Sequence, residues 1–387
     1  MPGLYLHIPF CKQACHYCNF HFSTSLGQQA AMTAALLREL TVRQHELAGA
    51  TLTSIYFGGG TPSLLPDADL AQLFEHIYDV FEVASDAEIT LEANPDDLTP
   101  PKLRALRDTP VNRLSIGVQS FAEADLQFMN RAHNADEAHQ CIENALRVGF
   151  DNLSIDLIYG VPTSSDVQWH RNLQTLVDYG IPHLSCYALT VEPRTALAHF
   201  IKTGKAPNVD EEQTARQFEY LLQCLRANGY EQYEISNFAR PGWQAQHNSS
   251  YWSGEAYLGI GPSAHSFDGR FTRRWNVANN AVYVRHWQNI TNYDELQSFE
   301  NELFEQEILS VEQRYNEYVM TALRTNKGIR KAQLHALGSA FETHFQARMA
   351  PFLVQGWLLV QDEAVVLSDA GKLLADFIAS ELFITNE

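Results

Sequence analysis

The stretch YLHIPFCKQACHYCNF, residues 5–20, decides how the chain is interpreted. It begins as a short apolar run and continues as a CxxxCxxC pattern formed by Cys11, Cys15 and Cys18. Only six cysteines occur in 387 residues, too few for a disulfide scaffold, so their clustering indicates a metal. A loop with this spacing can present three thiolates to three irons of a cubane cluster and leave the fourth iron open.

The residues alone leave a second metal centre open. His16 and His21 lie beside the cysteines, and three thiolates with one imidazole form a common tetrahedral zinc site. The remaining cysteines fall in helical or strand patterns, where we expect them to pack as small apolar side chains; they are Cys141, Cys186 and Cys224. The spacing therefore predicts an iron–sulfur or zinc centre in the loop after the first strand.

From this loop to about residue 190, short apolar runs alternate with longer segments of helical spacing. The predicted strands are 4–8, 54–57, 88–93, 113–118, 152–158 and 183–189, and the clearest predicted helices are 29–47, 67–81 and 135–149. Helical crossovers of this kind join parallel strands. The alternation predicts an α/β fold, either a partly closed barrel or an open doubly wound sheet.

Glycine or polar residues stand at or near the carboxyl ends of the predicted strands. They are Gly58, Gly59, Gly60, Glu92, Asn94, Gln119 and Asp156. The carboxyl ends of parallel strands meet at one edge, which is where α/β proteins bind ligands. We therefore expect these residues, which lie far apart in the sequence, to line one pocket.

We divide the chain into three regions. Residues 1–240 form the α/β domain, 241–299 a connecting segment, and 300–387 a smaller C-terminal domain. In the last region the sequence predicts helices, then two strands at 357–361 and 364–368, and a final helix. This order is typical of a winged helix. It contains more acidic than basic residues, so we expect it to pack or dock with a partner rather than bind DNA.

Composition excludes several classes of protein. The chain is 45% hydrophobic and carries 46 acidic against 27 basic residues, a formal net charge of −19. This charge repels nucleic acid and acidic lipid surfaces. No apolar run is long enough to span a membrane, and the first residues do not form a secretory leader, so we expect a cytoplasmic protein that meets membranes only through a partner.

The cysteine motif resembles the signature of the radical S-adenosylmethionine superfamily. Its amino-acid sequence is similar to that of the oxygen-independent coproporphyrinogen oxidase subgroup, which includes the HemW-type heme chaperones. Further motifs follow in the order seen in that subgroup: GGGTPS (58–63), EITLEANP (88–95), RLSIGVQSF (113–121), IDLIYGVP (155–162), HLSCYALTVEP (183–193) and HNSSYW (247–252). The resemblance covers nearly the whole chain and implies an incomplete (β/α)6 barrel, open on one side, with its cluster at the carboxyl-terminal mouth.

The resemblance also implies the cofactors. Cys11, Cys15 and Cys18 would hold a 4Fe-4S cluster, whose open iron is chelated by S-adenosylmethionine, and an electron from the reduced cluster would release a 5′-deoxyadenosyl radical. The implied S-adenosylmethionine contacts are Tyr5, Gly59, Gly60, Thr61, Glu92, Gln119, Arg131, Asp156 and Ala188. These residue types suit the ligand. Glycines let the backbone approach it closely, carboxylates accept hydrogen bonds from ribose hydroxyls or an ammonium group, and arginine can donate two parallel hydrogen bonds to a carboxylate.

Two functions fit this resemblance. One is a heme chaperone that binds heme and hands it to an acceptor protein; the other is a coproporphyrinogen III dehydrogenase, which oxidatively decarboxylates propionates to vinyl groups. The oxidases carry a further cysteine at the position of Phe20 and a sizeable segment before the cluster loop, so the comparison favours the chaperone. Whether the chain is an enzyme stays open, and radical chemistry would in addition require an electron donor.

A heme chaperone needs a ligand for the heme iron. His247, within HNSSYW, is the leading candidate because neutral imidazole is an axial heme ligand and the motif supplies two aromatic side chains. His265, in GIGPSAHSF, is the second candidate.

Overall fold

Six parallel strands form the centre of the molecule in the computed structural model, which describes residues 2–385. They are β1 (Gly3–Ile8), β2 (Leu52–Gly59), β3 (Val83–Ala93), β4 (Arg113–Gln119), β5 (Leu153–Tyr159) and β6 (His183–Ala188). Each strand pairs with the next one along the chain, so their carboxyl ends share one edge. The predicted strands and the predicted α/β class are confirmed.

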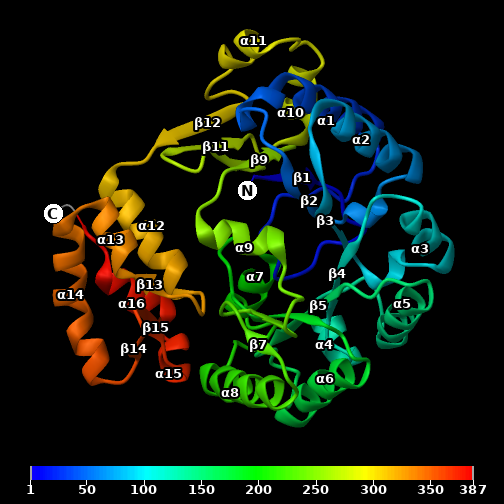
Figure 1. Cartoon of the computed structure of the whole chain (residues 1–387). Coiled ribbons are helices and arrows are strands. Elements are labelled where there is room, and N and C mark those ends of the chain that lie inside the picture. The colour runs from blue at the N-terminus through cyan, green and yellow to red at the C-terminus, as the bar shows by residue number, and fades with distance from the viewer. Residues whose placement is uncertain (1, 386–387) are drawn as a thin grey trace.

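Helices cover the outer face of this sheet. They include α1 (Gln29–Arg43), α2 (Asp67–Val80), α3 (Pro100–Arg107), α5 (Ala135–Arg147), α6 (Asp166–Asp178) and α8 (Glu211–Ala227). Figure 1 shows them as a ring outside the strands. The shorter α4 (Glu123–Phe128) and α7 (Ala196–Lys202) follow β4 and β6. The α5 boundaries follow from sequence, because Asn134 and Glu137 form a capping box and Gly149 takes a left-handed conformation just beyond the end.

The two faces of each strand differ in chemistry. In β1, Leu4 and Leu6 are buried in the core beneath the helices, whereas Tyr5 lies on the opposite face. The same alternation places Glu92 of β3 and Asp156 of β5 on the inner face, where they are in register with serines of the neighbouring strands. The apolar face therefore holds the fold together, and the polar face is left for a site.

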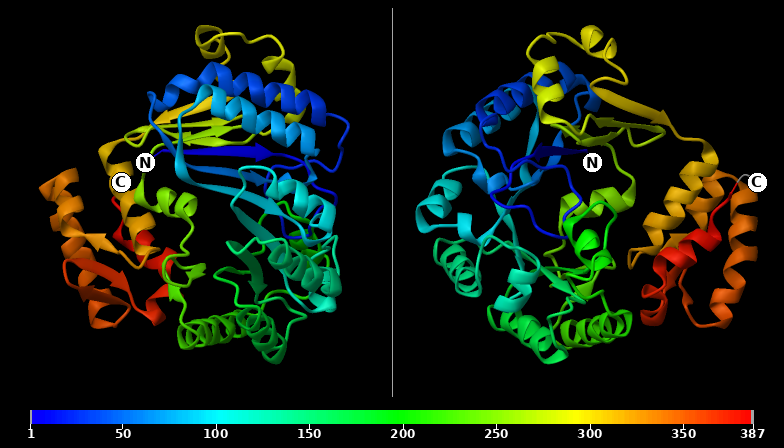
Figure 2. Two further views of the ribbon diagram at one scale, coloured as in Figure 1. Left: turned by 45° about the vertical axis from the view of Figure 1, so that its right-hand side comes forward. Right: turned by 180° about the vertical axis from the view of Figure 1, so that it is seen from behind.

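The sheet extends beyond these six strands on both sides. β9 (Tyr257–Ile260) pairs with β1 and is followed by β10 (His265–Phe267), β11 (Thr272–Asn276) and β12 (Phe304–Ile308). On the other side, β6 pairs with β8 (Asn237–Ala239), which pairs with β7 (Glu231–Gln232). Since β1 and β6 have other neighbours, the sheet of the described residues stays open, as the resemblance implied (Figures 1 and 2).

This extension changes the predicted division of the chain. Residues 241–299 do more than connect, because they contain β9 to β11 together with α9 (Gln246–Ser253), α10 (Asn280–Trp287) and α11 (Tyr293–Gln297). β12 also belongs to the large sheet, so the boundary predicted at residue 300 lies before a strand of the first domain. The strands are short, and only the pairing of β9 with β1 joins segments that are far apart in sequence.

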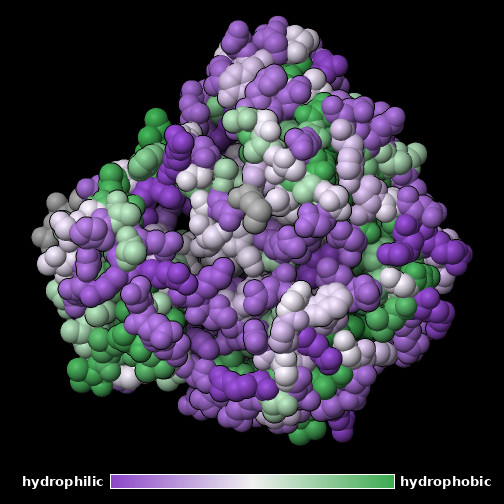
Figure 3. Space-filling view, viewed as in Figure 1, coloured by the Kyte–Doolittle hydropathy of each residue, from purple (hydrophilic) through white to green (hydrophobic). Residues whose placement is uncertain are grey.

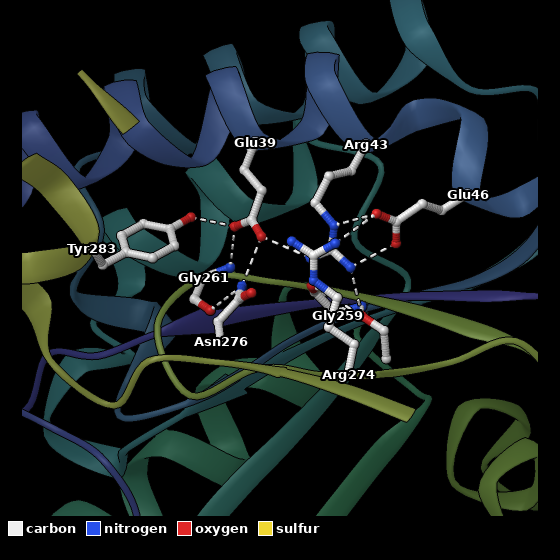
Figure 4. A network of polar contacts seen from close by, with 9 residues as sticks. Glu39, Arg43, Glu46, Gly259, Gly261, Arg274, Asn276 and Tyr283 are labelled. Carbon is white, nitrogen blue, oxygen red and sulfur yellow. Dashed lines mark hydrogen bonds and ion pairs between the residues drawn. The ribbon is translucent and has the colours of Figure 1, made fainter. Parts of the chain in front are cut away.

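A buried polar network fixes the extension to α1 (Figure 4). Glu39 and Arg43 of α1 form an ion pair at 2.7 Å, and neither side chain is exposed. Arg43 also pairs with Glu46, which in turn pairs with Arg274 of β11. Two carboxylates thus balance two guanidinium groups inside the protein, as burial of charge requires.

The C-terminal domain has its own apolar core, centred on buried residues such as Tyr315 and Phe345. Its elements are α12 (Val311–Leu323), β13 (Ile329–Arg330), α13 (Lys331–Leu337), α14 (Ser339–Val354), β14 (Leu358–Gln361), β15 (Ala364–Leu367), α15 (Asp369–Lys372) and α16 (Ala375–Leu382). The helix–strand–helix–helix–strand–strand order is that of the predicted winged helix. In Figure 3 a green apolar area covers the lower part of this domain. Val354 and Val360 are among its exposed apolar residues. Within residues 2–385, no helix is both long and apolar enough to span a bilayer.

Candidate functional site

The cysteine loop leaves β1 at the carboxyl edge of the sheet and is held at several points. The Cys11 amide donates to the carbonyl of Ser23 at 3.0 Å, which closes the base of the loop. In its middle, Asn130 donates to the carbonyl of Ala14 at 2.8 Å and accepts from Gln13 at 2.8 Å. The loop conformation is therefore set by the segment after α4 as well as by its own sequence.

The three thiols lie close to one another and are half-buried. Burial is the main reason that the pKa of Cys11 is raised to about 11; negative charge on Cys18 and Cys15 acts in the same direction, and the hydrogen bond from Thr61 opposes it. Two sulfurs receive hydrogen bonds: Thr61 Oγ1 lies 3.5 Å from the Cys11 sulfur, and Arg131 Nη1 lies 3.1 Å from the Cys15 sulfur. Donors aimed at sulfur stabilise thiolate over thiol, which is the form that binds a metal.

Arg131 links this loop to the strand ends. Its Nη2 donates to Asn94 Oδ1 and to the carbonyl of Gly117, both at 2.7 Å. Asn94 donates in turn to Thr61 at 3.2 Å. The Nε of Arg131 is buried and has no partner among the described residues. An unsatisfied donor of this kind is costly unless a ligand completes it.

Two carboxylates enclosed on the inner face lie beside this network. Burial raises the pKa of Glu92 to about 7 and that of Asp156 to about 6. Glu92 accepts hydrogen bonds from Tyr56 at 2.7 Å and from the amide of Gly59 at 3.2 Å, and Asp156 accepts from Ser115 at 3.3 Å. Buried carboxyl groups with raised pKa values are typical of sites that bind a cation or a hydroxyl donor.

The glycine triplet is needed for packing against β1. A side chain at Gly60 would place Cβ 2.7 Å from the carbonyl oxygens of Ile8 and Phe10. Gly59 has φ of +104°, and its Cβ would lie 2.6 Å from the ring of His7. The triplet therefore brings the turn after β2 against the start of the cysteine loop, with Thr61 directed at a sulfur.

The other predicted contacts vary in how closely they join this group. The rings of Tyr5 and Tyr56 have centroids 6.1 Å apart. Burial raises the pKa of the Tyr5 hydroxyl, and the negative charge of Glu92 raises it to a smaller extent. Gln119 ends β4 with a left-handed φ of 68°, a conformation that costs energy in a residue other than glycine and is often found at functional sites. Ala188 ends β6 in register with Tyr159.

A cavity of 1170 Å³ opens between the sheet extension and the C-terminal domain. Its lining begins at the cysteine loop with Phe20 and His21, continues along Tyr251, Trp252 and Tyr257, and reaches α12 and β13. Figure 3 shows the surface hollowed beside the C-terminal domain. Small-molecule sites usually enclose roughly 300 to 1,000 Å³, so this volume admits a large cofactor.

The two candidate histidines lie in different surroundings. His247 is 1% exposed, and both ring nitrogens have partners: Nδ1 lies 2.8 Å from Ser54 Oγ and Nε2 lies 2.9 Å from the Tyr251 hydroxyl. It is also absent from the cavity lining, so it offers no free nitrogen to an iron in this conformation. His265 lines the cavity, and among the described residues its ring makes no hydrogen bond; it stacks on Trp275 with centroids 6.0 Å apart.

The histidines of the cysteine loop have structural contacts. His16 Nδ1 lies 2.9 Å from the Phe128 carbonyl oxygen, and His21 Nε2 lies 2.7 Å from Asn280 Oδ1. Within residues 2–385, no three His, Cys, Asp or Glu side chains are arranged around a single metal ion. Thiolates of a cubane cluster bind different irons and do not converge on one point.

Sequence reasoning assigned no role to Tyr56, and it placed Asn94 among the strand-end residues without its contacts to Arg131 and Thr61. Tyr56 lies on the inner face of β2 beside Tyr5 and holds Glu92, and Asn94 joins Arg131 to Thr61. The signal for Tyr56 is its place in the strand alternation, and that for Asn94 is its position directly after β3. The buried Cys141, Cys186 and Cys224 pack as expected.

Comparisons with known proteins agree with this geometry. Residues 5–176 match the Radical SAM superfamily, and residues 309–374 match the HemN C-terminal domain. The chain is 35% identical over 384 residues to the heme chaperone HemW of Mycobacterium tuberculosis, covering 98% of this chain and 94% of the relative. It is 33% identical over 380 residues to HemW of Bacillus subtilis, covering 97% of each.

A solved structure has the same fold. The coproporphyrinogen III oxidase HemN of Escherichia coli, described as a radical SAM enzyme, superposes with a TM-score of 0.82 at 24% identity, covering 99% of this chain and 90% of that one. The fold, the cysteine loop and the full-length likeness lead to one conclusion. The chain belongs to the HemW family of the radical S-adenosylmethionine superfamily.

Proposed function

We propose that this protein binds heme in the 1170 Å³ cavity and hands it to an acceptor protein, with a 4Fe-4S cluster and S-adenosylmethionine held at the adjoining strand ends. The observation that carries the proposal is the lining of the cavity. Aromatic side chains and a histidine without hydrogen bonds surround a volume large enough for a tetrapyrrole, and the lining includes residues of the cysteine loop. The relatives named heme chaperones support the same reading.

The residues at the strand ends fit the cluster. Three half-buried thiols lie in one loop, and Thr61 and Arg131 direct donors at two of the sulfurs. We therefore assign the cluster to Cys11, Cys15 and Cys18. When bound, the cluster and S-adenosylmethionine supply one-electron chemistry.

The residues around the cluster loop fit S-adenosylmethionine. The unpartnered Nε of Arg131 can receive the carboxylate of the ligand, and Glu92 and Asp156 can accept from its ammonium or ribose hydroxyls. A cation beside these carboxylates would lower their raised pKa values. Tyr5, Gly59, Gly60, Gln119 and Ala188 complete the proposed contact set.

His265 is the better candidate for the heme-iron ligand. Partial burial and the charge of Arg273 lower the pKa of its imidazole, which keeps the ring neutral at pH 7 as coordination requires. The planar side chains of Tyr257, Trp252 and Phe20 lie in the same lining and can contact a macrocycle. His247 would have to give up two hydrogen bonds and leave its buried position first.

Heme titration followed by absorbance tests this proposal. The native protein should give a saturable Soret band with one heme per chain, and His265→Ala should weaken binding and shift that band. His335→Ala is the matched control, because this histidine is 69% exposed on α13 and lies outside the cavity lining. An unchanged spectrum in His265→Ala would place the ligand elsewhere. Turnover of coproporphyrinogen III would favour dehydrogenase activity instead.

A further inference from the structure

The large cavity has a charge opposite to that of the protein. The whole chain carries a formal charge of −19, yet the lining contains four basic residues, Arg273, Arg314, Lys327 and Arg330, against two acidic ones, Glu255 and Glu317. A positive pocket attracts anions, whereas the acidic surface of the rest of the molecule repels them. Its ligand is therefore expected to be negatively charged.

The clearest cationic group joins the two domains. Arg273 lies on β11 and Arg314 on α12, and both contact Glu317: Arg273 Nη1 at 2.9 Å from Oε1, and Arg314 Nη1 at 3.3 Å from Oε2. One carboxylate thus serves two guanidinium groups, and Glu307, in register with Arg273 on the neighbouring strand β12, supplies a second negative charge nearby. The Nε of Arg273 is buried and has no partner among the described residues.

The same two arginines stand against an aromatic wall. The Cζ of Arg314 lies 4.9 Å from the centroid of the Phe267 ring, and that of Arg273 lies 5.8 Å from it. Packing against the ring limits the motion of both side chains, so less conformational entropy is lost when they bind a ligand. Phe267 belongs to β10, the strand that begins with His265.

Two further cations line the part of the cavity that belongs to the C-terminal domain. Lys327 precedes β13 and Arg330 ends it, both are exposed, and neither forms an ion pair within residues 2–385. These two residues therefore form a second cationic group in the same cavity lining, in addition to the paired arginines.

We propose that the carboxylates of the bound tetrapyrrole are held by Arg273 and Arg314, with Lys327 and Arg330 as a second anion subsite, so that the C-terminal domain forms half of the ligand site. The inference rests on the proposed heme binding and adds how the ligand is oriented. A macrocycle bound in this way turns its propionates toward α12 and β13 while its metal faces His265. Guanidinium forks suit carboxylates because they can donate two parallel hydrogen bonds.

The test compares heme with heme dimethyl ester, whose carboxylates are uncharged. The native protein should bind heme roughly tenfold more tightly than the ester, the difference expected for one charge-assisted contact at a partly exposed site. Arg314→Met should reduce that preference, because Arg273 and the second subsite remain. Arg348→Met, which removes an exposed arginine of α14 outside the cavity lining, is the matched control and should keep it.

A second variant changes affinity in the opposite direction. Glu317→Gln removes the carboxylate that competes with the ligand for the two arginines, so it should strengthen heme binding several-fold and leave ester binding unchanged. A gain in affinity cannot result from misfolding.

The outcomes separate the inference from the function on which it rests. Equal affinity of the native protein for heme and ester, or weaker heme binding in Glu317→Gln, would overturn the propionate subsite and leave heme binding standing. Failure of the native protein to bind either compound would overturn the proposed function and the inference together.

Discussion

Replacing Glu39 by glutamine should destabilise the protein more than any exposed charge substitution. The carboxylate of Glu39 is fully buried and accepts from Arg43 at 2.7 Å, from Asn276 at 2.6 Å and from the amide of Gly261 at 2.8 Å, as well as from Tyr283 (Figure 4). Glutamine keeps the shape and removes the charge. The balanced cluster of two carboxylates and two guanidinium groups then carries an uncompensated buried positive charge.

The size of the effect follows from that imbalance. Removing one partner of a buried ion pair costs about 3–5 kcal/mol. For a cooperative unit of about 300 residues, an unfolding entropy of about 2.1 cal/mol/K per residue converts this into a decrease of about 5–8 °C in Tm. The loss of stability should be measurable because Glu39 connects α1 to the turn directly after β9, to β11 and to α10, which support the wall of the cavity.

Thermal unfolding followed by circular dichroism measures this decrease. Arg216→Met is the control, because the ion pair of Arg216 with Asp166 is exposed (54% and 43%) and such pairs contribute about 0–1 kcal/mol. A Tm for Glu39→Gln within 1 °C of the native protein would refute the view that the buried network fixes the sheet extension.

Three further predictions concern the candidate site. Cys15→Ser should remove the brown absorbance of the reconstituted cluster while far-ultraviolet circular dichroism stays native; a full cluster in that variant would exclude the ligand assignment. Gly60→Ala should destabilise the protein by about 1–3 kcal/mol, because its Cβ would lie 2.7 Å from two carbonyl oxygens, whereas Gly27→Ala, with nothing within 4 Å, should be tolerated in denaturant unfolding. Burial raises the pKa of Glu92 to about 7, so the unfolded chain loses this proton first and the contribution of Glu92 to the free energy of unfolding should decrease as pH rises from about 4.5 to 7. Buried histidines such as His247, whose pKa burial lowers to about 3, contribute the opposite slope, so the prediction concerns the difference between the native protein and Glu92→Gln in urea titrations at each pH. The same pH dependence in both proteins would contradict it.

The sequence predicts the part of the fold that has strong local periodicity. The six parallel strands are recognisable because apolar residues such as Leu4 and Leu6 alternate with inner-face residues, and α5 is recognisable by its caps. The strands β9 to β12 escaped prediction because they are three to five residues long, and because β9 joins the sheet through β1, which is far away in the chain. Residue β-propensity carries little information at that length.

The candidate site also contains residues that the sequence predicts and residues that it does not. The cysteines and the strand-end carboxylates belong to motifs that can be recognised in the sequence, so their roles could be proposed without the structure. The burial of His247 and the exposure of His265 could not be, because they depend on which strands and helices surround each ring. The pairing of Arg273 with Arg314 through Glu317 likewise arises only when the two domains meet.

One anaerobic measurement tests the central claim most directly. The cluster is reconstituted, and a single preparation is titrated with heme and also incubated with coproporphyrinogen III, S-adenosylmethionine and a reductant. A heme carrier predicts stoichiometric heme binding and no release of CO₂ or vinyl product. Conversion of coproporphyrinogen III without heme binding would contradict it and identify the cavity as the site of a dehydrogenase.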